Sequence, residues 1–77
     1  MPTVFLFRRL KFCIYPKDHN PPHVHVRGVN FEVKVGLESF EVISIKGSIS
    51  SRELKLIVSQ IKQRHDDLLE AWNDYCN

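Results

Sequence analysis

The chain has 77 residues, of which 43% are hydrophobic and 26% are charged, so its composition is that of one small globular domain, residues 1–77. This length excludes a multidomain enzyme and a repeat array, and no apolar run approaches the ~20 residues of a membrane span. Basic residues outnumber acidic ones six to two in residues 1–36, whereas acidic residues prevail seven to five in residues 37–77. The basic N-terminal half suits an anionic partner, of which nucleic acid is the first candidate. The alternative is that these residues form a solvated face of a sheet.

The cysteines and the N-terminus indicate a cytoplasmic protein. Cys13 and Cys76 form no Cys-x-x-Cys pair, so we expect reduced thiols and neither a disulfide scaffold nor a zinc knuckle. The first apolar run, residues 4–7, is short and precedes Arg8-Arg9, which is the reverse of a signal-peptide pattern.

The first half of the chain favours strands. Residues 3–7 and 11–15 are rich in β-branched and aromatic side chains and predict two strands joined by a tight turn at residues 8–10. Residues 16–22 contain three prolines and predict a loop. Residues 40–45 predict a further strand, and its apolar side chains on both faces indicate burial on both sides.

A β-hairpin over residues 23–27 and 31–35 is indicated by alternating polar and apolar residues. Gly28 suits the first central position of a two-residue type II′ turn. That turn would pair His25 with Glu32 and Val24 with Val33. Residues directly opposite each other share a face of the sheet. One face would then carry Val24, Val26, Phe31 and Val33, and the other His23, His25, Glu32 and Lys34.

The second half predicts one helix. Ser50-Ser-Arg-Glu53 fits a capping box, and apolar residues recur at helical spacing from about Ser51 to Tyr75. Such a helix is about 37 Å long and the strands only about 20 Å, so one end must overhang the sheet, bend, or pack on another chain. The predicted fold is α+β: a curved antiparallel sheet of four or five strands packed against one long C-terminal helix. His65 lies on the core-facing stripe, and we expect a core or boundary histidine with one hydrogen bond.

Three of the four histidines lie in His19-Asn-Pro-Pro-His23-Val-His25 and suggest acid–base chemistry, because imidazole titrates near neutral pH. In this interpretation His23 and His25 exchange protons, with Glu32 as their orienter. Basic side chains would hold a phosphate group, as in a small metal-independent ribonuclease; they are Arg27, Lys34, Arg8 and Arg9.

The same histidines permit a metal site, with zinc as an example and no other cofactor expected. His23 and His25 point the same way about 6.5–7 Å apart on a strand, and Glu32 would be a third ligand or an orienter. His19 is a further ligand only if the loop folds back, because an extended path places it ~12 Å from His23. The remaining interpretation is a solvated or partner-facing polar surface.

Four segments resemble a family of very short bacterial proteins catalogued as a domain of unknown function: Met1-Pro-Thr-Val-Phe5, Asp18-His-Asn-Pro-Pro-His-Val-His25, Ser50-x-x-Glu-Leu54 and Leu68-Leu-Glu-Ala-Trp72. The resemblance covers essentially the whole chain, and His-Asn-Pro-Pro-His-x-His is its specific part. Matched family positions are Asp18, His19, Pro21, Pro22, His23, His25 and Glu32. Arg8-Arg9-Leu10 stands where many relatives carry a glycine-rich turn.

The resemblance implies a genomic context, because members of the family are often encoded beside a second small protein, as in toxin–antitoxin pairs. It implies no mechanism. The leading hypothesis is therefore a toxin-like, RNA-directed component of a two-gene module that a partner protein holds in check. The alternatives are a protein-interaction module without enzymatic activity and a histidine-dependent metal-binding protein. We also expect that the C-terminal helix could support a homodimer.

Overall fold

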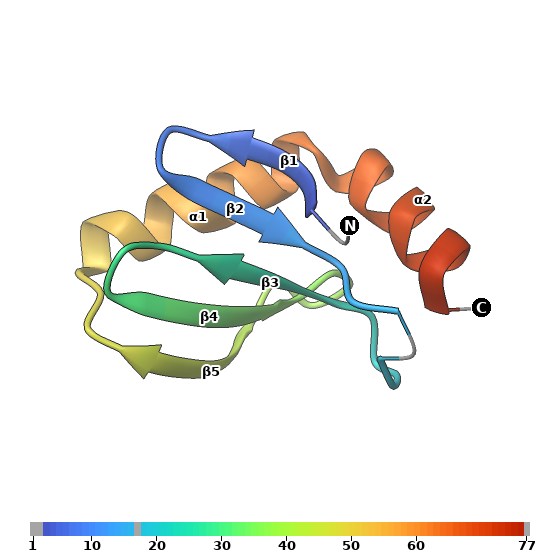
Figure 1. Ribbon diagram of the computed structural model, residues 1–77, viewed down its shortest axis with the longest axis horizontal. Coiled ribbons are helices and arrows are strands. Elements are labelled where there is room, and N and C mark those ends of the chain that lie inside the picture. Colours follow the sequence, from blue (N-terminus) through green and yellow to red (C-terminus); the bar gives the residue numbers. More distant parts are fainter. Residues whose placement is uncertain (1–2, 17, 77) are drawn as a thin grey trace.

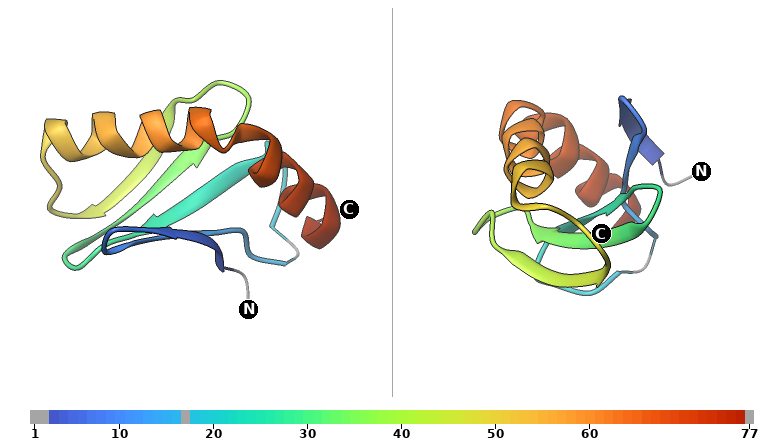
Figure 2. Two further views of the ribbon diagram at one scale, coloured as in Figure 1. Left: turned by 90° about the horizontal axis from the view of Figure 1, so that it is seen from above. Right: turned by 90° about the vertical axis from the view of Figure 1, so that its left-hand side faces the viewer.

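The computed structural model describes residues 3–16 and 18–76, and it is α+β with one five-stranded antiparallel sheet. The strands lie side by side in chain order: β1 (Thr3–Phe7), β2 (Leu10–Cys13), β3 (His23–Arg27), β4 (Phe31–Gly36) and β5 (Val42–Gly47). Helix α1 (Ser51–Gln63) crosses one face of the sheet, and α2 (His65–Cys76) continues beyond it (Figures 1 and 2). The α+β class and the antiparallel sheet agree with the sequence prediction.

The β3–β4 hairpin forms with the predicted faces but in a different register. His25 is opposite Lys34 and Val24 is opposite Val35, so each pairing is displaced by two residues. The two-residue turn is Val29-Asn30, because Gly28 N–H donates to Phe31 O at 2.9 Å. Gly28 makes room for the Phe31 ring, which a Cβ atom there would strike. A displacement of two residues keeps every side chain on its predicted face.

Strand β5 departs from its prediction in position and in burial. It spans Val42–Gly47, two residues later than expected, and all six residues are exposed. It is one of the two edge strands of the sheet, and the prediction that both of its faces are buried is wrong. Gly36 N–H and Phe40 N–H close the preceding turn by donating to Glu41 O and Gly36 O.

The single long helix is replaced by two helices that meet at Arg64, whose φ of −108° and ψ of 23° end α1. The predicted N-terminus of the helix is confirmed, because Ser50 Oγ accepts a hydrogen bond from Glu53 N–H at 3.1 Å and donates one to Glu53 Oε1 at 3.3 Å. Figure 2 shows α2 turning down toward the end of the sheet where the loop before β3 lies. The bend keeps Leu68 and Trp72 buried beyond the length that a straight helix could cover.

The core fills the space between the sheet and the helices. The sheet contributes the four valines of β3 and β4, together with Phe12, and the helices contribute Ile57, Ile61, Leu68 and Trp72. Val24, Val26 and Val33 therefore face the helices, as predicted. Among the described residues, neither helix is long and apolar enough to cross a membrane.

Candidate functional site

Three side chains meet where the loop after β2 enters β3. Asp18 Oδ2 lies 3.1 Å from His23 Nε2 and 3.1 Å from His25 Nε2. The two histidines alternate with valine on one strand, so both point to the face opposite the β3 valines, where His23 is nevertheless buried. The loop returns Asp18 onto that face, and one potential ligand atom from each residue lies within 4.8 Å of the other two. We call these residues the Asp18–His23–His25 cluster.

The Nδ1 atom of each imidazole, which points away from Asp18, lies beside a separate acceptor. His23 Nδ1 lies 2.8 Å from Pro21 O, and His25 Nδ1 lies 3.3 Å from Glu32 Oε2. In the tautomer with the ring proton on Nδ1, each imidazole donates that proton to its acceptor. Both Nε2 lone pairs then point at the same carboxylate oxygen. In that tautomer the three atoms are suited to hold a metal ion between them.

Aromatic rings surround the histidines on the side away from solvent. His23 is only 6% exposed, and its ring lies 5.1 Å from the rings of both His25 and Trp72. Tyr15 packs edge-on against His25, with ring centroids 4.6 Å apart. Because Trp72 comes from α2, the bend at Arg64 brings the second helix to this site. The rings fix the orientation of both imidazoles.

Some of the residues predicted to assist the histidines lie on the histidine face of the sheet. Glu32 contacts His25 diagonally, since Lys34 takes the position directly opposite His25. Arg27 is exposed and forms a salt bridge with Glu32, with Nε 3.5 Å from Oε1. His25, Glu32 and Lys34 line a small hollow of about 80 Å³ together with Ser44 and Lys46 of β5. These contacts put two ammonium groups beside the site.

Three other candidates, His19, Arg8 and Arg9, lie outside the cluster, as does His65. His19 is exposed, and it does not belong to the group of converging ligand atoms, so Asp18 takes the place that the metal hypothesis gave to His19. Arg8 and Arg9 form the β1–β2 turn near the opposite end of β3, where Arg8 has a φ of 57°. His65 is partly buried, and its Nε2 lies 2.6 Å from Leu37 O, as expected for a boundary histidine with one hydrogen bond.

Two members of the site were not predicted from sequence. Asp18 was identified only as a motif position; the signal that could have found it is a carboxylate in the loop directly before a His-x-His strand. Tyr15 had no signal, because its place on His25 depends on the path of the chain after β2. Burial, with the Cys13 thiol, raises the pKa of Tyr15 above 10.0, while Arg27 lowers it. The phenol therefore stays protonated at neutral pH.

An open hollow of about 360 Å³ adjoins the cluster. Its lining combines the loop and the sheet: Asp18, His19, Asn20, Pro21, His23, Lys34 and Ile43. The cluster is thus enclosed by Trp72 and Tyr15 on one side and reached from solvent on the other. A ligand that entered the hollow would meet the His23 imidazole, the Asp18 carboxylate and the Lys34 ammonium group.

Comparison with known proteins identifies a family but no characterised relative. The family model described as "Domain of unknown function (DUF4160)" matches residues 9–73. No curated protein and no solved structure matches the chain.

Proposed function

The chain belongs to the DUF4160 family, and we propose that its Asp18–His23–His25 cluster binds a divalent transition-metal ion. The observation that carries this proposal is the convergence of both Nε2 atoms on Asp18 Oδ2 at 3.1 Å. The Nδ1 atoms are held by Pro21 O and the Glu32 carboxylate, which is the usual arrangement behind metal-ligating histidines.

The size of the cluster suits such an ion. Zinc binds imidazole nitrogen and carboxylate oxygen at about 2.0–2.2 Å, so neighbouring ligand atoms of a tetrahedral site stand roughly 3.3 Å apart. The separations of 3.1 Å and the upper bound of 4.8 Å permit this geometry with small side-chain movements. Two imidazoles and one carboxylate suit zinc, iron, nickel or copper better than magnesium or calcium.

Three protein ligands leave a coordination position for another molecule. Sites that keep an open position are typical of metals with a chemical role, whereas structural zinc sites use four protein ligands. The hollow of about 360 Å³ is lined by two of the three ligands, Asp18 and His23, and would give access to that position. A bound metal would supply Lewis acidity there, and Lys34 would attract an anionic ligand.

Zinc titration of tag-free protein tests the proposal. Isothermal titration calorimetry should detect one site, and the His25→Ala and Asp18→Asn variants should each lose most of the affinity. The matched control is His19→Ala, which removes an exposed imidazole from the same loop and should bind zinc as tightly as the unaltered chain. Equal binding by His25→Ala, or an equal loss in His19→Ala, would show that the ligand set is wrong.

The second candidate is the RNA-directed component of a toxin–antitoxin-type module. Lys34 and Lys46 flank His25 on one sheet face, and this observation favours a phosphate-bearing ligand. Lys34→Ala and Lys46→Ala should weaken RNA binding and flatten its salt dependence, because each removes a phosphate contact. Expression without the neighbouring gene should slow growth, and His25→Ala should relieve it. Harmless expression and no RNA binding would refute this candidate.

A further inference from the structure

Strand β5 is an edge strand that exposes three β-branched apolar side chains. Val42, Ile43 and Ile45 are 38%, 49% and 46% exposed, although β-branched aliphatic residues normally occupy strands that are covered. Within the described residues the sheet pairs β5 only with β4, so its other edge presents backbone N–H and C=O groups to solvent. Such an edge is a template for pairing with another chain.

The apolar side chains of β5 stand on both faces of the sheet. Ile45 is opposite Val33, whose side chain is buried beneath the helices, so Ile45 extends the helix-facing side. Ile43 lies at the β-bulge and lines the hollow that also contains His23 and Lys34. A neighbouring strand would therefore find apolar contacts above and below its backbone.

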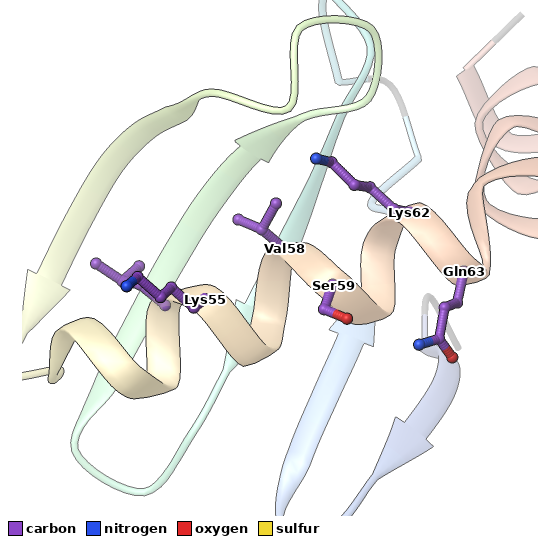
Figure 3. A pocket seen from close by; sticks show the side chains of 6 residues that line it. Lys55, Val58, Ser59, Lys62 and Gln63 are labelled. Atoms are coloured by element: carbon purple, nitrogen blue, oxygen red, sulfur yellow. The ribbon is translucent and has the colours of Figure 1, made fainter.

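Helix α1 adds a groove on its side of the sheet. The groove has a volume of about 580 Å³ and runs along the helix past Leu54, Lys55, Val58, Ser59, Lys62 and Gln63. Figure 3 shows Val58 and Lys62 pointing from α1 toward the side of the sheet that β4 and β5 form. An added strand at β5 would lie beside this mixed apolar and basic surface.

The charges around β5 identify the partner's chemistry. Lys46 on β5 and Lys34 on β4 share the histidine face, and neither takes part in a salt bridge with any described residue. A second copy paired through β5 would add its own Lys34 and Lys46 to this face, which raises the positive charge there and does not neutralise it. A partner with carboxylates would instead neutralise both ammonium groups.

We infer that β5 binds an extended segment of another protein in which apolar and acidic residues alternate. The segment adds a sixth strand, with its backbone bonded to β5, its apolar residues beside Ile45 and its carboxylates near Lys34 and Lys46. This inference rests on the sheet edge alone and does not require a metal at the Asp18–His23–His25 cluster.

A labelled peptide of about ten residues, in which valine alternates with glutamate, tests this surface with the full-length protein. Fluorescence anisotropy should show binding below about 1 mM, and amide NMR shifts should change along β4 and β5. The Ile43→Thr, Ile45→Thr double variant should bind roughly tenfold more weakly, because it removes exposed apolar groups that the bound peptide would cover. Leu6→Thr, the matched change on the opposite edge strand, should bind like the unaltered chain; Leu6 is 64% exposed.

Charge reversal distinguishes specific strand pairing from nonspecific hydrophobic binding. Lys46→Glu should weaken binding of the glutamate peptide about two- to fivefold and strengthen binding of the corresponding lysine peptide. Absence of binding at about 1 mM, shifts confined to β1, or equal losses in Leu6→Thr and the double variant would overturn the inference. Concentration-dependent dimerisation abolished by the double variant would show that the occupant is a second copy, which also overturns it.

Discussion

Replacement of Glu32 by glutamine tests how the site is built without touching a ligand. Glu32 Oε2 lies 3.3 Å from His25 Nδ1 and orients the ring so that Nε2 faces Asp18. Glutamine keeps the size of the side chain and removes its charge. A carboxylate behind a metal-bound imidazole typically contributes 10–100-fold to metal affinity. Because the Glu32 side chain is 34% exposed, solvent screens it, and we expect the lower end, roughly tenfold.

The assay is competition for zinc or cobalt against a chromophoric chelator. A tenfold loss corresponds to about 1.4 kcal/mol, which is well within reach of such a titration. Arg27→Gln is the control, because it removes the 3.5 Å salt bridge to Glu32 and leaves the contact with His25 in place. Its effect should be small, since the Arg27 side chain is 58% exposed. Unchanged affinity in Glu32→Gln, or an equal loss in Arg27→Gln, would refute the role assigned to Glu32.

Three further substitutions test the framework by urea denaturation and metal titration. Gly28→Ala should destabilise the fold by about 1–3 kcal/mol, because its Cβ displaces the Phe31 ring; a change below about 0.5 kcal/mol would contradict the packing. His65→Ala should cost about 1 kcal/mol through the lost bond to Leu37 O while zinc affinity stays unchanged; weaker zinc binding would place His65 in the site. Ser50→Ala should cost about 1 kcal/mol, and no loss would show that the cap is not needed.

Secondary-structure type and side-chain facing could be predicted from the sequence because both depend on local periodicity. Alternation over residues 23–27 and 31–35 placed the valines of β3 on one face and the histidines on the other, although burial of His23 against Trp72 was not foreseen. The start of α1 followed from Ser50 and Glu53, whose hydrogen bonds lie within one turn. The grouping of His23 and His25 on one face likewise needs only the two-residue repeat of a strand.

Register, the helix break and the third member of the cluster depended on contacts between distant residues. The Phe31 ring against Gly28 selects the Val29-Asn30 turn, and a turn rule based on glycine alone favours the wrong register. The bend at Arg64 arises because α2 must keep Trp72 buried against His23, a contact between residues far apart in the chain.

Asp18 and β5 show why composition alone was insufficient for the site and the partner surface. Asp18 meets the histidines only because the proline-containing loop returns onto the strand face. Strand β5 has the residues of a covered strand, and only the strand order reveals that it lies at an edge. Sequence periodicity reports which face a residue occupies, whereas the neighbours on that face are determined by how the whole chain closes around its core.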